Sequence, residues 1–179
     1  GAGLGGDFNV KQGKINFFGN GMYNANKSTG TQITYREDKL NNTLATFNQT
    51  GKNNNDGHFA FARAGIDYLI DNRNTLTVSG NLVNGKFDNN GLRTILRDTT
   101  IGNYFASETG KINNLSSFTF KNLGGTISFK HNFAKANKSI TADANYFSSS
   151  NTGSSLSKTQ YFDMTGNSKF GEGKQLMEN

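Results

Sequence analysis

Hydrophobic and polar residues alternate most regularly between residues 59 and 82. Successive side chains of a strand point to opposite faces, so the residues of each run can be sorted by parity. One parity holds mainly Ala, Ile and Tyr before residue 71 and Leu, Val and Gly after residue 74, whereas the other parity is mostly polar. Residues 71–74 between the runs are rich in types that bond their own backbone or tolerate left-handed geometry. This stretch therefore predicts a β-hairpin with one apolar and one polar face.

The alternation recurs along the chain and predicts about seven strands. They are expected near residues 4–10, 15–24, 58–70, 75–87, 115–133, 140–146 and 159–164. Ile33 and Tyr35 add a strand extension or a hairpin within a loop. Between residues 115 and 133 the apolar parity changes, from even at Phe120 to odd at Leu123. A change of face within one strand predicts an inserted residue, and the glycine pair at 124–125 is the expected β-bulge.

The connections between these strands alternate in length. Short turns are predicted near 11–14, 71–74 and 134–138, and long polar loops near 38–57, 88–114 and 148–158. Bacterial outer-membrane barrels have this pattern of short periplasmic turns and longer extracellular loops. The predicted strands also reach the ~9–11 residues that cross a bilayer when tilted. We therefore expect an all-β, antiparallel up-and-down meander in which residues 1–179 form one segment of a transmembrane barrel in the bacterial outer membrane.

Composition is compatible with this prediction and narrows the chemistry. The chain has 22 Gly and 27 Asn among its 179 residues, and no Cys, Pro or Trp. The absence of Cys excludes disulfides, thiolate metal sites and a catalytic thiol. No run of ~20 apolar residues predicts a transmembrane helix. The mean hydropathy is −0.64, but a membrane barrel can have a low value because only alternate strand residues need be apolar.

Parity assigns a solvent to each face of the predicted strands. Charged side chains are costly in hydrocarbon, so the polar parity should face an aqueous lumen. The candidates for lipid-facing positions are Ala62, Ala64, Ile66, Val78, Leu82, Ile127, Ala142 and Ala144. The candidates for lumen-facing positions are Arg63, Asp67, Thr77, Asn81, Lys130 and Asp143.

Other motifs do not predict catalysis or ligand chemistry. Residues 1–6 match G-x-G-x-x-G, but that motif needs a preceding strand and a following helix. His58 and His131 are the only histidines and fall in different predicted strands. The net charge of +6 comes largely from Lys residues in predicted turns, not from one stripe. We therefore expect no enzyme activity, no metal, no cofactor and no nucleic-acid partner.

Three segments carry a resemblance to a known family. They are residues 14–24 (KINFFGNGMYN), 63–80 (RAGIDYLIDNRNTLTVSG) and 140–146 (ITADANY). The chain resembles the outer-membrane β-barrel family related to TonB-dependent receptors, and the Gly-x-Asp-Tyr, turn and Asn-Thr-Leu order of the middle segment is the most specific part. The resemblance implies a barrel of many strands, with a plug domain, energy-coupling proteins, membrane lipid and an unknown solute as partners.

The expected function is therefore that of a barrel fragment. About seven strands would leave open edges in lipid, where unpaired backbone groups are costly. We expect a fragment of a TonB-dependent receptor-like protein that forms the barrel wall for uptake of a nutrient or metal chelate. The alternative is a soluble antiparallel β-barrel or an adhesin-like binding domain, in which the apolar parity would face inward.

Overall fold

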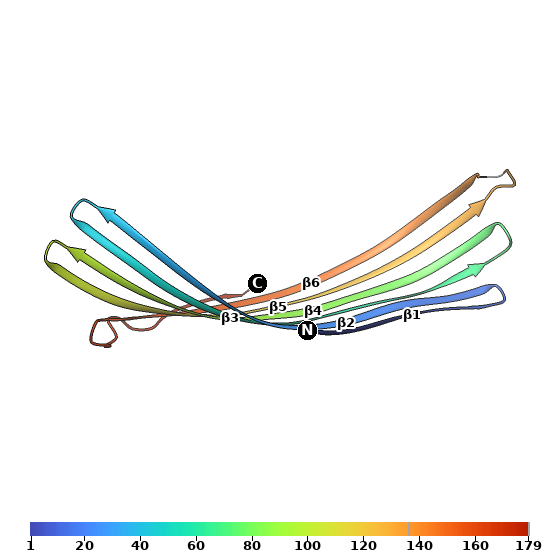
Figure 1. Cartoon of the computed structure of the whole chain (residues 1–179). Helices are drawn as coiled ribbons and strands as arrows, with labels where there is room; N and C mark the ends of the chain where they lie inside the picture. Colours follow the sequence, from blue (N-terminus) through green and yellow to red (C-terminus); the bar gives the residue numbers. More distant parts are fainter. Residues whose placement is uncertain (136, 179) are drawn as a thin grey trace. The chain divides into compact units, whose positions relative to one another are not determined.

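The chain forms one antiparallel sheet of seven strands that follow one another in sequence order (Figure 1). The computed structural model describes residues 1–135 and 137–178. The strands are β1 (Ala2–Gln12), β2 (Ile15–Leu40), β3 (Thr43–Leu69), β4 (Asn74–Ile101), β5 (Tyr104–Asn132), β6 (Ser139–Phe162) and β7 (Gly173–Glu178). The predicted all-β, antiparallel meander is thus confirmed. In the described residues, no helix has the length and hydrophobicity needed to cross a membrane.

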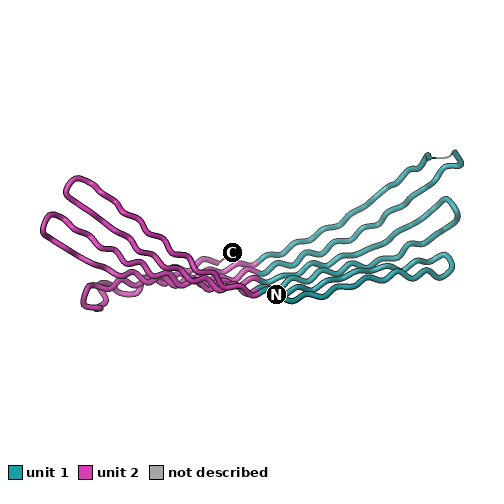
Figure 2. Tube along the Cα trace, viewed as in Figure 1, with its two compact units in different colours: residues 1–26, 57–86, 119–151 teal, residues 27–56, 87–118, 152–179 magenta. Residues whose placement is uncertain are grey.

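The residues group into two compact units (Figure 2). Unit 1 comprises residues 1–26, 57–86 and 119–151, and unit 2 comprises residues 27–56, 87–118 and 152–179. Strands β2 to β6 each contribute residues to both units.

The strands are joined by tight reversals. Gly13 has a φ of 60° between β1 and β2, and Gly102 has a φ of 58° between β4 and β5. A positive φ of this size is easiest for glycine, which has no Cβ to clash with the backbone. At the end of β5, the Phe133 N–H donates to the Lys138 carbonyl at 2.9 Å. Residue 136 of the predicted 134–138 turn lies outside the described residues.

The long loops predicted near 38–57, 88–114 and 148–158 are wrong, because these segments are strand apart from two-residue turns at 41–42 and 102–103. β3 already begins at Thr43, β4 continues to Ile101 and β5 begins at Tyr104, while β6 runs on to Phe162. Polar residues predominate on both parities of these segments and the apolar residues do not alternate with them, so the sequence pattern does not predict a strand. Their pairing is supported by polar cross-strand contacts such as Thr29 Oγ1 donating to Asn54 Oδ1 at 2.9 Å.

The predicted β-bulge at residues 124–125 is also wrong. Between β4 and β5, Asn74 contacts His131 and Gly85 lies against Phe120. The number of residues from Asn74 to Gly85 on β4 equals the number from Phe120 to His131 on β5. On β5 and β6, Thr126 bonds Asn145 and Asn122 bonds Ser149, again with equal separations. No residue is therefore inserted in either ladder. The change of parity means that the apolar side chains move to the other face of a regular strand.

Aromatic rings lie over glycines of neighbouring strands in unit 1. A Cβ built on Gly65 would be 2.4 Å from Phe18 Cζ, and one on Gly85 would be 2.5 Å from Phe120 Cε1. Separations this short exclude a side chain at either glycine while the rings keep their positions. These pairs fix the lateral fit of β2 on β3 and of β4 on β5, because the ring covers the backbone that glycine leaves bare.

The turn between β3 and β4 is held by a single carboxylate. Asp71 Oδ1 accepts the backbone N–H groups of Arg73 and Asn74, both at 2.8 Å, and Oδ2 accepts the Asn74 side-chain amide at 2.7 Å. The Asn74 side-chain bond, followed by the Arg73 backbone bond, lowers the pKa of Asp71. The ionised carboxylate is therefore favoured by the folded turn.

We predict that this turn makes stability depend on pH. Because the folded-state pKa of Asp71 is depressed, its contribution is complete at neutral pH and is lost as the pH falls through that lowered pKa. Asp71→Asn retains an acceptor oxygen but cannot titrate, so it should reduce the loss of stability on acidification. Urea titrations of both proteins at neutral and acidic pH measure this difference. An unchanged pH dependence in the variant would contradict the assignment.

The described residues form almost no hydrophobic core. Ala45, with 9% of its surface exposed, is the one buried hydrophobic residue among them. Large side chains remain exposed instead, including Phe8 at 54% and Ile127 at 53%. Stable soluble domains bury apolar faces between two packed layers. Within the described residues this chain supplies one layer only, so its apolar surface needs another environment.

Candidate functional site

A cross-strand network defines one face of unit 1. Asp67 Oδ2 accepts a hydrogen bond from Asn16 Nδ2 at 3.1 Å, and Asp67 Oδ1 accepts one from Thr77 Oγ1 at 2.7 Å. These bonds place residues of β2, β3 and β4 on the same side of the sheet. Both oxygens of the half-buried carboxylate are used, so the network links three strands at the end nearest the Asp71 turn.

The same side continues onto β5 and β6. Between β4 and β5, the Asn81 side chain covers Gly124, and a Cβ built on Gly124 would be 2.4 Å from Asn81 Oδ1. Between β5 and β6, Thr126 Oγ1 donates a hydrogen bond to Asn145 Oδ1 at 2.8 Å. Because side chains alternate along each strand, these contacts fix the facing of the other residues. All six predicted lumen-facing residues share this side, which we call the polar face: Arg63, Asp67, Thr77, Asn81, Lys130 and Asp143.

Arg63 and Asp67 have different neighbours on the polar face. The Arg63 guanidinium carbon lies 5.7 Å from the centroid of the Phe18 ring. Asp67 is instead bonded to Asn16 and Thr77. Arg63 and Asp67 therefore contact residues of neighbouring strands and not each other, as their separation along β3 predicts. The polar face thus combines charged side chains with aromatic surface.

The opposite side of unit 1, which we call the apolar face, carries the other set. It contains all eight predicted lipid-facing residues: Ala62, Ala64, Ile66, Val78, Leu82, Ile127, Ala142 and Ala144. On this face, residues 60–69 of β3, 74–84 of β4, 123–131 of β5 and 139–149 of β6 include no Asp, Glu, Lys or Arg. Ile66, Val78 and Ile127 are 42%, 49% and 53% exposed. Unit 1 thus has an uncharged, uncovered apolar surface opposite a polar one.

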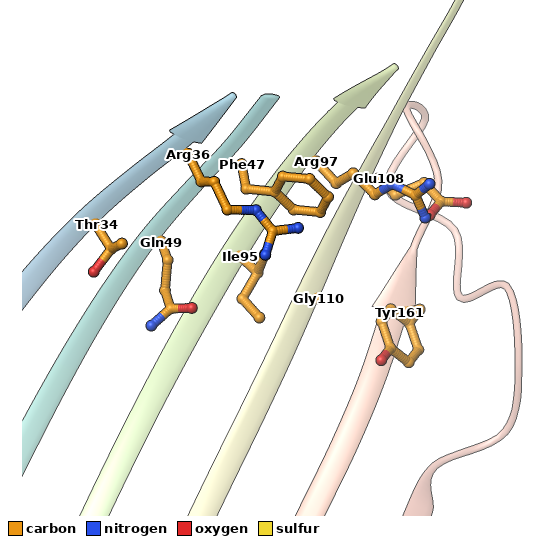
Figure 3. Close-up of a pocket in the computed structure, with 9 residues that line it drawn as sticks. All are labelled: Thr34, Arg36, Phe47, Gln49, Ile95, Arg97, Glu108, Gly110 and Tyr161. Atoms are coloured by element: carbon orange, nitrogen blue, oxygen red, sulfur yellow. The ribbon is translucent and has the colours of Figure 1, made fainter. Parts of the chain in front are cut away.

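Unit 2 contains a groove on one side of five adjacent strands (Figure 3). Its volume is about 370 Å³, within the range of small-molecule sites. Neighbouring strands β2 to β6 contribute the lining, which combines basic, aromatic, aliphatic and amide side chains. The nine lining residues are Thr34, Arg36, Phe47, Gln49, Ile95, Arg97, Glu108, Gly110 and Tyr161.

Two arginines flank one aromatic ring in this groove. The guanidinium carbon of Arg36 lies 4.5 Å from the Phe47 ring centroid, and that of Arg97 lies 5.7 Å from it. In Figure 3 the Arg36 side chain extends from β2 to the Phe47 ring, whereas the Arg97 side chain extends from β4 toward Glu108. Arg36 Nη2 also bonds Asp38 Oδ2 at 2.7 Å. At these distances the face of the Phe47 ring attracts both guanidinium groups.

The acid in the groove already has a cationic partner. Lys169, from the segment between β6 and β7, bonds Glu108 Oε1. Arg97 Nη1 is 4.0 Å from Glu108 Oε2, which is longer than a hydrogen bond. The bond from Lys169, and after it the charges of Lys169 and Arg97, lower the pKa of Glu108. Lys169 therefore neutralises the carboxylate and leaves the Arg97 donors available to a ligand.

Sequence reasoning missed this groove because its residues fall largely in the predicted loops 38–57 and 88–114. One signal was present: Phe47 and Gln49 share a parity, as do Ile95 and Arg97. Residues two positions apart on a strand face the same side, so each pair would share one surface if its segment were a strand. The order of the strands then brings those positions together, which no single segment reveals.

The two histidines pack against aromatic rings. His58 stacks with Tyr23 at 6.2 Å between ring centroids, and His131 packs edge-on against Phe133 at 4.8 Å. His131 Nδ1 also contacts Asn74 Oδ1 at 2.7 Å. Across residues 1–135 and 137–178, no group of three or more His, Cys, Asp or Glu side chains could hold a metal ion.

Comparisons with known proteins give weak structural neighbours. No family model matches the chain, and no curated protein matches it. Over 89% of its length the chain is similar, at 6% identity and a TM-score of 0.21, to 45% of one chain of the membrane pore complex of pneumolysin. Over 99% it is similar, at 9% identity and a TM-score of 0.15, to 42% of BauA, the ferric preacinetobactin receptor of Acinetobacter baumannii. Over 96% it is similar, at 11% identity and a TM-score of 0.16, to 60% of the outer membrane channel DcaP of the same organism.

The chain thus spans less than half the length of the first two of these structures. These neighbours are a pore complex, a receptor and a channel. TM-scores this low do not show that this chain belongs to any of their families.

Proposed function

We propose that the chain is part of the wall of a bacterial outer-membrane β-barrel, with the apolar face of unit 1 against lipid. The observation that carries this proposal is the uncharged, uncovered apolar face opposite a polar face in a single-layered sheet. In water such a face would be unfavourable by about 25 cal/mol for each Å² exposed. In hydrocarbon it needs no second layer, and antiparallel pairing satisfies the backbone polar groups.

The length of the apolar face agrees with a bilayer. Its uncharged stretch on β3, residues 60–69, is close to the ~9–11 residues of a tilted membrane-spanning strand. Unit 2 has a different character, with Lys27, Lys39 and Lys52 on one side of its strands and Arg36, Arg93 and Arg97 on the other. Charge on both faces favours an aqueous environment for unit 2.

The finer part of the proposal is uptake of a nutrient or metal chelate, as the resemblance to TonB-dependent receptors implies. The polar face of unit 1 would line the lumen, with Arg63, Asp67, Thr77, Asn81, Lys130 and Asp143 in contact with water, solute or a plug domain. Energy-coupling proteins would act on that plug. The charged and hydrogen-bonded polar face supports an aqueous lumen.

A barrel of this kind also needs pairing for the edges of the sheet. In the described residues β1 pairs with β2 alone and β7 pairs with β6 alone. Unpaired edge groups cost several kcal/mol each in hydrocarbon. We propose that further strands, supplied by the same polypeptide or by neighbouring copies, close the wall.

Spin labels along β3 test the proposed facing. With the chain reconstituted in lipid vesicles, labels at positions 62, 64 and 66 should be accessible to oxygen, which concentrates in lipid. Labels at 63, 65 and 67 should be accessible to a water-soluble nickel complex, because their side chains lie on the polar face. The reverse pattern would overturn the proposal. A monodisperse soluble monomer without affinity for micelles would favour the soluble barrel or adhesin-like alternative.

A further inference from the structure

The groove of unit 2 has the features of a site for a small aromatic anion. Its lining combines two guanidinium groups with the apolar surfaces of Phe47, Ile95 and Tyr161. A guanidinium presents up to five N–H donors in a planar fork that matches a carboxylate. Arg36 uses Nη2 toward Asp38, and the nearest Glu108 oxygen is 4.0 Å from Arg97 Nη1. Both arginines therefore retain donors for an incoming oxyanion.

We propose that this groove binds an aromatic carboxylate, with the carboxylate on Arg97 and Arg36 and the ring against Ile95 and Tyr161. The position of each partner follows from the strand order. Arg36, Phe47 and Arg97 form one row across β2, β3 and β4, and Gln49, Ile95, Gly110 and Tyr161 form the next row across β3 to β6. The charged end and the ring of one small molecule would thus occupy adjacent rows.

Gly110 lies between Tyr161 and Ile95 in the lining of the groove. A Cβ at this position would lie 3.3 Å from Tyr161 Cε1 and 3.9 Å from Ile95 Cβ. Any side chain larger than hydrogen would therefore occupy the space between the two apolar walls. Lys169 contributes to the charge balance, because its bond to Glu108 offsets the charge of the acidic residue in the lining. The nearby Asp38 carboxylate is offset by its ion pair with Arg36. The inference concerns unit 2 alone and does not depend on whether unit 1 lies in lipid.

Calorimetric titration of the full chain in detergent micelles tests the site, with benzoate as the probe. Acetate offers the carboxylate without the ring, and benzyl alcohol offers the ring without the charge. We expect benzoate to bind at least about tenfold more tightly than either, since it alone engages both rows. Equal binding of acetate and benzoate would overturn the proposal, as would binding of benzyl alcohol as tight as that of benzoate.

Variants locate the binding in the groove. Arg97→Gln should weaken benzoate binding about tenfold by removing a charge-assisted contact. Gly110→Leu should weaken it similarly without changing the charge. Arg93→Gln is the matched control, because Arg93 is on the same strand with the same parity but does not line the groove. Loss of binding in the Arg93 variant, or full binding in the other two, would show that the site lies elsewhere.

Discussion

Ala64→Arg is expected to prevent or strongly weaken insertion of the chain into bilayers, whereas Thr77→Arg should leave insertion nearly unchanged. Ala64 is in the middle of the apolar face, and an Arg at the bilayer midplane of a barrel's lipid face costs ~2–4 kcal/mol. Thr77 is on the polar face and donates to Asp67. An Arg at position 77 would lose the threonine hydrogen bond, but its positive charge would lie near the Asp67 carboxylate. Urea titrations of folding into lipid vesicles measure the two free energies.

Depth along the strand provides an internal control for this prediction. Tyr68 and Leu76 lie on the apolar face next to the turn that joins β3 to β4. The cost of Arg falls to ~0–1 kcal/mol near a membrane interface. Tyr68→Arg and Leu76→Arg should therefore cost less than Ala64→Arg. If all the apolar-face variants cost the same as Thr77→Arg, lipid does not cover this face.

The facing of residues in unit 1 could be predicted from sequence because its two faces differ, one apolar and one polar. Residues of each parity therefore have the character of the face on which they lie. The hairpin of β3 and β4 illustrates this, since Ala62 and Val78 alternate with Arg63 and Thr77 and only one register puts each set on its own face. The network around Asp67 needed the structure. Its members come from three strands, and the register that joins Asn16 to Asp67 is determined by the reversal of β2 into β3 far along the chain.

The pattern of unit 2 could not be read in the same way. Asn53, Asn54 and Asn55 are consecutive residues of a strand, although Asn is normally depleted in strands. What makes them a strand is pairing with neighbours, and strand propensity depends strongly on such context. Asn54 accepts a hydrogen bond from Thr29, a partner distant in sequence. A segment whose partners are polar and distant resembles a loop when it is examined alone.

The bulge prediction failed for a related reason. A change of apolar parity predicts an inserted residue, but the regular pairing of β5 with β4 and β6 shows that no residue is inserted. Phe120 lies over Gly85 on the polar face, while Leu123 and Ile127 lie on the apolar face. Parity thus reports which face is apolar at each point of a strand, and that face can change along a long regular strand.

Gly65→Ala should destabilise the sheet by ~1–3 kcal/mol, the usual cost of forcing an atom into a packed site. The new Cβ would be 2.4 Å from Phe18 Cζ and 2.7 Å from Ser79 Cβ, so the ring must move and β4 must shift relative to β3. Gly125→Ala is the matched control, because nothing lies within 4 Å of a Cβ there. An alanine at position 125 should be neutral or stabilising by ~0.5–1 kcal/mol, since it reduces backbone entropy in the unfolded chain.

A double variant separates the ring contact from other effects at Gly65. Phe18→Ala removes the side chain that occupies the space above Gly65, so Phe18→Ala with Gly65→Ala should cost less than the sum of the two single variants. Denaturant titrations of the four proteins in the same detergent give the coupling energy. Strict additivity would mean that Phe18 does not restrict position 65. A cost for Gly65→Ala no greater than that of Gly125→Ala would mean that ring-over-glycine packing does not hold β2 and β3 together.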